Sequence, residues 1–250
     1  MEREERIQLA KDISAAFIER HGEAVVATGI RGSVARLEDV EQSNLNVVIV
    51  TTSPEPAGAP RSLLHGPIAV ECYVVGENAY RDEARMIGPW WPVRADQFVH
   101  YMPLHDPTEF WNGLRRVYEK AIEEAPADAF VRAETANIVQ AVSWAYKARA
   151  AARSAPQMAE LAIAEAALRA VLAIGLRARF AFKNVSHALQ FAPSLPGAPP
   201  SFGAALQRAL SSQLDTEEAV SALEDAIEGL LNAAMQNNVP VVAEGVNEFL

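Results

Sequence analysis

The chain has 250 residues, of which 50% are hydrophobic and 22% are charged, a composition typical of a globular protein with a sizeable core. Its 22 Lys and Arg residues against 32 Asp and Glu residues give a net charge of -10, which argues against general nucleic-acid binding and favours a small or cationic partner. The lone cysteine, Cys72, excludes an internal disulfide, and the charged N-terminus lacks the apolar core of a signal peptide, so we expect a cytoplasmic protein.

The first hundred residues alternate between helix and strand signals. Apolar residues recur at helical spacing up to His21 and Gly22, where the first helix is predicted to end. Runs rich in Val and Ile then predict strands at residues 24–28, 47–51 and 68–75. This order predicts an N-terminal domain with a mixed sheet.

Weaker signals complete this half of the chain. The segment 53–62 is rich in Pro and Gly and predicts a loop, whereas residues 97–102 predict an edge strand. Asp106 and Pro107 then predict the start of a helix. We therefore place a domain boundary after residue 105.

The second part of the chain has a helical composition. Residues 121–190 hold 23 alanines, which favours helix over strand. The most apolar stretch, residues 158–176, contains three charged residues, so it predicts a buried bundle helix and not a membrane span. Asp215 and Glu218 predict the capping box of a last long helix. The expected fold class is α+β, with a mixed-sheet domain at residues 1–105 and an all-α helical bundle at residues 106–250.

The segment that carries chemistry joins a predicted strand to a predicted helix. Gly32 and Ser33 lie at this junction, where backbone N–H groups, a hydroxyl and the helix N-terminus would favour an anion such as a triphosphate. The following strand places Asn44 and Asn46 on one face, so metal-binding groups at these two positions would converge on one ion. The segment therefore predicts a phosphate site beside a possible metal position.

This arrangement, with Glu71 on a neighbouring strand, resembles the pol-beta nucleotidyltransferase superfamily. Over residues 24–242 the chain resembles the kanamycin nucleotidyltransferase family, in which an α/β domain precedes a helical domain often grouped with HEPN domains. The resemblance implies a homodimer with its active site in a cleft between subunits. It also implies transfer of a nucleoside monophosphate from a Mg²⁺-bound nucleoside triphosphate to an aminoglycoside hydroxyl.

The chain departs from this family at the metal site. The family has metal-binding carboxylates at the positions of Asn44 and Asn46, and a general base on the helix that corresponds to residues 138–144, which carry no acid here. Glu71 matches the third acid, and burial on its apolar strand would be costly unless the two amides are its partners. The residues expected to contact a nucleotide are Gly32, Ser33, Arg36 and Lys147.

Mg²⁺ requires anionic ligands, and an amide oxygen is neutral. The resemblance therefore implies an impaired enzyme that retains at most nucleotide or small-ligand binding, with Glu71 as its remaining catalytic acid. No metal is firmly predicted, and Mg²⁺ with a nucleoside triphosphate would be the cofactors of a working site.

Two alternatives remain open. One is an active nucleotidyltransferase that modifies a small, aminoglycoside-like hydroxyl acceptor. The other is a non-enzymatic interaction module, a fused form of the paired minimal-nucleotidyltransferase and HEPN systems. Position 182 is Phe where a HEPN nuclease would have Arg, so His187 is predicted to be a packing or helix-start residue. No membrane association is expected.

Overall fold

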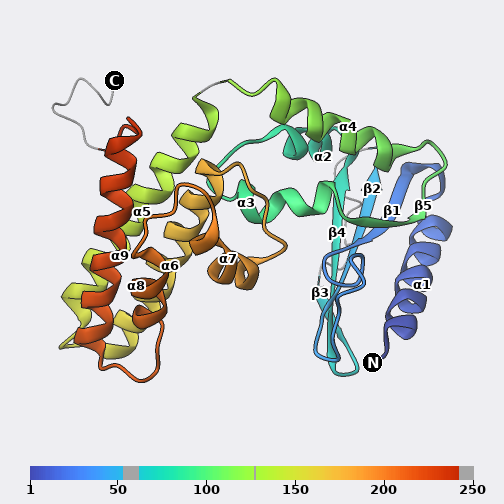
Figure 1. The fold of residues 1–250 in the computed structure, drawn as a ribbon. Coiled ribbons are helices and arrows are strands. Elements are labelled where there is room, and N and C mark those ends of the chain that lie inside the picture. The colour runs from blue at the N-terminus through green and yellow to red at the C-terminus, as the bar shows by residue number, and fades with distance from the viewer. Residues whose placement is uncertain (53–61, 127, 242–250) are drawn as a thin grey trace. The chain divides into compact units, whose positions relative to one another are not determined.

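The computed structural model describes residues 1–52, 62–126 and 128–241. It divides into two compact units, one formed by Met1–Met86 with Ala95–Ala125 and the other by Ile87–Arg94 with Pro126–Leu250. Figure 1 shows a sheet with helices in the first unit and helices alone in the second. The α+β class with a helical C-terminal region is thereby confirmed.

The first unit is built on a five-stranded mixed sheet with the order β3-β4-β2-β1-β5. Strands β2 and β4 are parallel, and the other neighbouring pairs are antiparallel. The three strands expected from the Val and Ile runs are confirmed with small shifts at their ends. The strands are β1 (Val25–Arg31), β2 (Leu45–Thr51), β3 (Ser62–His65), β4 (Ile68–Gly76) and β5 (Tyr101–His105).

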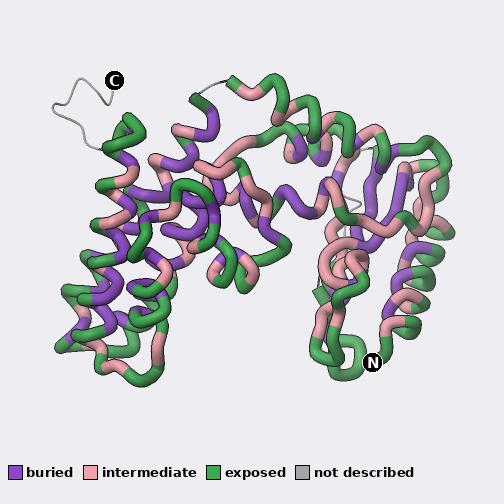
Figure 2. The backbone as a smooth tube through the Cα atoms, viewed as in Figure 1, coloured by how far each residue is buried: buried purple, intermediate pink, exposed green. Residues whose placement is uncertain are grey.

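Helix α1 covers one face of this sheet, and helices α2 and α4 pack against the other. On β2, Leu45, Val47 and Ile49 belong to the core beneath α1, and α1 itself alternates between buried and exposed positions in Figure 2. The residues between them on β2 therefore face the opposite side. The helical segments are α1 (Arg3–His21), η1 (Gly22–Ala24), α2 (Glu77–Arg85), η2 (Ala95–Phe98) and α4 (Phe110–Glu123).

Helix α4 belongs to the sheet unit, although the sequence analysis assigned residues 106–125 to the helical part. Its Trp111 lies against Gly29 of β1, where an added Cβ would be 2.7 Å from the indole Cζ2 atom, and the indole Nε1–H donates to the Thr28 carbonyl at 3.3 Å. The Asp106 carboxylate accepts from the Phe110 backbone N–H at 2.6 Å. The helix thus begins at residue 110, later than Asp106-Pro107 suggested.

Two further elements differ from the sequence-based expectations. The strand expected at residues 97–102 is replaced by η2 and the later strand β5, because the backbone N–H groups of Val99 and His100 turn back to the Asp96 carbonyl. Strand β3 was missed because it is exposed along its whole length and has no apolar alternation. The loop expected at residues 53–62 lies outside the described residues except for Ser62, which begins β3.

The second unit consists of helices packed through small residues. Alanines fill much of the contact between α5 and α6, so the two helices approach closely. The capping box of α9 is confirmed, because Asp215 Oδ1 accepts from the Glu218 N–H at 2.9 Å and Glu218 Oε2 accepts from the Asp215 N–H at 3.3 Å. The helical segments are α3 (Trp91–Arg94), α5 (Ala129–Ala151), α6 (Pro156–Arg177), α7 (Val185–Phe191), η3 (Ala192–Ser194), α8 (Phe202–Ala209) and α9 (Thr216–Gln236).

The segment 87–94 lies within this helical unit because its aromatic residues have their partners there. The Trp91 and Phe130 rings are 5.1 Å apart and nearly perpendicular. The Arg169 guanidinium lies 4.5 Å from the centroid of the Trp90 ring. Both tryptophans therefore pack against helices of the second unit. Among the described helices, none has an apolar stretch long enough to cross a membrane.

Candidate functional site

The candidate site begins with a row of polar residues across the sheet. The backbone register pairs Arg31 of β1 with Asn46 of β2, and Asn46 with Glu71 of β4. Cross-strand partners project from the same face of a sheet, so these three side chains share the face opposite α1. Asn44 lies two residues before Asn46 and projects from that face as well.

Weak hydrogen bonds join the two amides to Glu71. The Asn46 Nδ2 atom donates to Asn44 Oδ1 at 3.3 Å, and Asn44 Nδ2 donates to Glu71 Oε1 at 3.4 Å. Both distances are long for hydrogen bonds. Glu71 itself is exposed, so it avoids the burial cost that the sequence analysis considered for this strand. The structure thus brings three predicted positions together as one amide and carboxylate cluster.

The Gly32–Ser33 turn adjoins this cluster. Gly32 has φ +78°, a conformation that favours glycine, and a Cβ added there would lie 3.1 Å from Asn46 Nδ2. The expected helix after Ser33 does not form: residues 33–37 make a turn closed by bonds such as Glu38 N–H to the Ser33 carbonyl at 2.9 Å, and Leu37 has φ +60°. The turn therefore lacks the helix N-terminus that would favour an anion.

Arg36 does not present its charge to solvent. Its side chain is only 5% exposed, and it forms ion pairs with the Asp96 carboxylate and, at 3.1 Å, with Glu38 Oε2. The His100 Nδ1 atom lies 2.8 Å from the other Asp96 oxygen. Arg36 therefore anchors the turn after Ser33 to η2. The sequence did not indicate this role, because nothing near Arg36 in the chain predicts a contact with Asp96.

Arg31 is a residue that the sequence reasoning missed. Its guanidinium donates to the amide oxygen of Gln97 and lies 5.0 Å from the centroid of the Tyr73 ring. Both of these partners are neutral. The signal available in the sequence was its position, since Arg31 immediately precedes the Gly-Ser pair at the end of a strand.

The residues present do not fit the pair of magnesium ions that the family resemblance implies. Two-metal transfer needs several anionic ligands to hold the ions about 3.5–4 Å apart. Here the cluster supplies one carboxylate, Glu71, and two neutral amides. Within the part of the chain that the structure describes, no group of three or more His, Cys, Asp or Glu residues is arranged to hold a metal.

The remaining predicted nucleotide contact, Lys147, belongs to the second unit. It lies on α5, and its Nζ atom is 3.7 Å from the centroid of the Trp144 ring. The helix segment 138–144 carries no acid, and Glu134 on the same helix is buried in an ion pair with Arg177 at 2.7 Å. Burial raises the pKa of Glu134, and Arg177 partly opposes that rise.

Other candidates from the sequence take structural roles. His187 stacks on Phe191 with ring centroids 5.1 Å apart, and its backbone N–H is capped by the Asn184 side chain at 2.8 Å, which confirms it as a packing and helix-start residue. Arg149 of α5 pairs with Glu224 of α9, and Arg153, which follows α5, pairs with Glu217 of α9. Both ion pairs are exposed and join these residues at the surface of the second unit.

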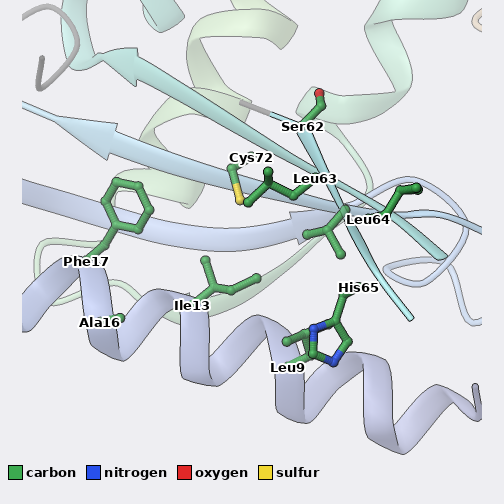
Figure 3. Close-up of a pocket in the computed structure, with 10 residues that line it drawn as sticks. Leu9, Ile13, Ala16, Phe17, Ser62, Leu63, Leu64, His65 and Cys72 are labelled. Atoms are coloured by element: carbon green, nitrogen blue, oxygen red, sulfur yellow. The ribbon is translucent and has the colours of Figure 1, made fainter. Parts of the chain in front are cut away.

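A separate apolar groove lies on the opposite side of the sheet, between α1 and strands β3 and β4. Its volume is about 280 Å³, and Figure 3 shows Phe17 and Ile13 of α1 facing Leu64 and Cys72. Burial raises the pKa of the Cys72 thiol. The groove lies on the face of the sheet that α1 covers. The amide and carboxylate cluster lies on the opposite face, so the two sites are separate.

Comparisons with known proteins agree with this fold. No family model matches the chain. Two curated relatives, both named aminoglycoside nucleotidyltransferase (4'), from Staphylococcus aureus and a Bacillus species, are each 27% identical over 234 residues, which is 92% of this chain and 90% of the relative. A solved structure of a nucleotidyltransferase-like protein from Exiguobacterium sibiricum matches with a TM-score of 0.56 and 12% identity, over 97% of this chain and 80% of that one. Over most of its length the chain is thus similar to proteins named aminoglycoside nucleotidyltransferase, and it shares the fold of a solved nucleotidyltransferase-like protein.

Proposed function

We propose that the chain binds a nucleoside triphosphate, or a small ligand with similar phosphates, at the Gly32–Ser33 turn, and that it has lost efficient nucleotide transfer. The observation that carries this proposal is the cluster of Asn44, Asn46 and Glu71, in which amides occupy the positions expected for two metal-binding carboxylates. The turn beside the cluster keeps the glycine conformation that exposes backbone donors.

The physical reason for impaired transfer is the loss of charge and of a base. A neutral amide oxygen holds Mg²⁺ more weakly than a carboxylate does. The helix segment 138–144 supplies no acid, and a general base alone contributes about 10²–10⁴-fold to a rate. Glu71 remains as the single acid of the cluster, so the chain keeps a binding surface without the full catalytic set.

Labelled ATP and GTP test the proposal. We expect saturable binding of at least one of them, and no fast transfer of labelled nucleotide to any aminoglycoside. Gly32→Ala is expected to weaken binding because it disturbs the turn. Rapid labelling of an aminoglycoside, or no nucleotide binding under any condition, contradicts the proposal.

A second variant tests the assignment of the metal positions. The double substitution Asn44→Asp with Asn46→Asp restores two carboxylates beside Glu71, and we expect it to bind Mg²⁺ or Mn²⁺ more tightly than the unmodified chain. Calorimetric titration of both proteins with each metal gives the comparison. Equal metal affinities would mean that residues 44 and 46 do not occupy metal positions.

The names of the relatives favour an active aminoglycoside nucleotidyltransferase as the second candidate function. It predicts that labelled nucleotide is incorporated into a small hydroxyl acceptor and that Glu71→Ala abolishes this incorporation. Incorporation that survives Glu71→Ala would exclude a role for this acid.

The wider biological setting is part of the same proposal. We expect a cytoplasmic homodimer with a HEPN-like helical unit and a small, cationic or nucleotide ligand. Light scattering on the purified chain measures its mass in solution, and a monomer at all concentrations would exclude the homodimer. A stable protein partner in pull-down experiments, with no thermal shift on adding nucleotide, would instead favour the non-enzymatic interaction module.

A further inference from the structure

Arg31 gives the candidate site a positive charge that the sequence analysis did not consider. We propose that Arg31 supplies the charge that metal ions supply in a site with three carboxylates, so that the nucleotide phosphates bind as a metal-free anion. This inference rests on the proposed function, because it specifies the ionic form in which the nucleotide is recognised.

The first support is the position of Arg31 in the sheet. It is the last residue of β1 and the direct neighbour of Gly32 in the turn. Its backbone partner is Asn46, whose own partner across β2 and β4 is Glu71. With strands about 4.8 Å apart, the Arg31 backbone lies one strand from Asn46 and two strands from Glu71 on the same face.

The second support is that the charge of Arg31 is still available, whereas that of Arg36 is not. Arg36 is buried and paired with Asp96 and Glu38. The partners of Arg31 among the described residues are the neutral Gln97 amide and the Tyr73 ring. An arginine with neutral partners can bind a phosphate without first giving up an ion pair.

The third support is the balance of charge in the cluster. A site with three carboxylates has three negative charges and repels a triphosphate until cations neutralise them. Replacement of two carboxylates by Asn44 and Asn46 leaves Glu71 as the one negative group of the trio, and Arg31 on the same face balances it. Arg31, the two amides and Glu71 together therefore carry no net charge, and their guanidinium and amide N–H groups are donors that suit phosphate oxygens. The next acid, Glu83, accepts a hydrogen bond from the Tyr73 hydroxyl.

The test measures ATP binding by calorimetry with EDTA and, separately, with excess Mg²⁺. The unmodified chain is expected to bind ATP with EDTA at least as tightly as with Mg²⁺. Arg31→Gln is expected to weaken binding in EDTA about tenfold or more, since it removes a charge-assisted contact. Arg31→Lys keeps the charge without the planar fork and is expected to fall between these two.

Arg20→Gln is the matched control, because Arg20 is an exposed residue near the end of α1, on the other side of the sheet, and its loss changes the net charge equally. Circular dichroism melts show whether each variant remains folded. Inorganic triphosphate serves as a second probe and separates phosphate recognition from recognition of the base.

Each outcome decides the inference. Binding that requires Mg²⁺, or equal affinities for Arg31→Gln and the unmodified chain, overturns the role of Arg31 and leaves nucleotide binding intact. A tenfold loss in both Arg31→Gln and Arg20→Gln reduces the effect to net charge and also overturns it. Absence of ATP binding in both EDTA and Mg²⁺ contradicts the proposed function itself, so the two failures are distinguishable.

Discussion

Gly32 has two separate reasons to be glycine. Its positive φ is unfavourable for other residues, and the space beside its Cα is limited by the Asn46 amide 3.1 Å from where a Cβ would lie. The backbone requirement affects folding, whereas the amide contact affects the amide and carboxylate cluster. A comparison of two glycines separates these effects.

Gly32→Ala and Gly66→Ala form that comparison. Gly66 also has a positive φ, of +57°, but a Cβ there meets no atom within 4 Å. Both substitutions are expected to lower the free energy of unfolding by about 1–2 kcal/mol, and only Gly32→Ala is expected to weaken nucleotide binding as well. Urea unfolding and ATP titration of both variants provide the measurements. Equal loss of binding in the two variants would contradict a specific contact between Gly32 and Asn46.

Cys72 lies in the apolar groove, on the face of the sheet opposite the amide and carboxylate cluster. Burial raises the pKa of its thiol, so a smaller fraction is thiolate at a given pH than in the unfolded chain. Because the pKa is higher in the folded state, Cys72 is expected to react with iodoacetamide more slowly in the folded chain than in urea, with a rate that rises at higher pH. Mass spectrometry after timed labelling checks this without ambiguity, since the chain has one cysteine. Equal rates in both states would show that the groove leaves the thiol fully accessible.

At the scale of elements, the Arg36–Asp96 ion pair connects the turn after β1 to η2. Both side chains are largely buried, with 5% and 10% of their surface exposed, and His100 supports the same carboxylate. Removal of one partner leaves a buried charge without compensation. This pair therefore fixes the position of the Gly32–Ser33 turn through a contact sixty residues away in the sequence.

A double-mutant cycle measures this connection. Arg36→Met and Asp96→Asn are each expected to lower the free energy of unfolding by about 3 kcal/mol, and the double variant by at least about 1 kcal/mol less than the sum. Chemical denaturation of the four proteins gives the coupling. Additive losses would show that the two side chains do not stabilise each other. Nucleotide titration of Asp96→Asn then shows whether a released turn binds more weakly.

At the scale of the whole molecule, the net charge of -10 and the local chemistry of the site point to different partners. The acidic excess repels a long polyanion, whereas Arg31 and the backbone donors of the turn suit a short phosphate group. Salt screens exposed charges beyond about 8–10 Å. A bound phosphate therefore interacts mainly with Arg31 and the turn beside it, and only weakly with the acidic residues elsewhere on the surface.

Chromatography at low ionic strength tests the effect of the net charge. The chain is expected to pass through heparin without retention and to bind an anion exchanger at neutral pH, as its pI of about 5.1 requires. Addition of 0.5 M salt is expected to release it from the exchanger. Retention on heparin would reveal a basic surface large enough to overcome the net charge.

The residue pattern alone determined the order of the main elements and the amide and carboxylate cluster of the candidate site. Val and Ile runs gave strands β1, β2 and β4, and alternation along β2 put residues 44 and 46 on one face, because these signals are local. The capping box at Asp215 was readable for the same reason.

Tertiary structure decided what local signals do not contain. The pairing of Arg31 with Asn46, the burial of Arg36 against Asp96 and the membership of α4 in the sheet unit all join residues distant in sequence. The helix expected after Ser33 does not form, and the reason is also tertiary. Arg36 forms an ion pair with Asp96 of η2, and the backbone turns at Leu37, which has a positive φ. The sequence thus identified the two amides and the carboxylate of the cluster, and only long-range packing added Arg31 and paired Arg36 with Asp96.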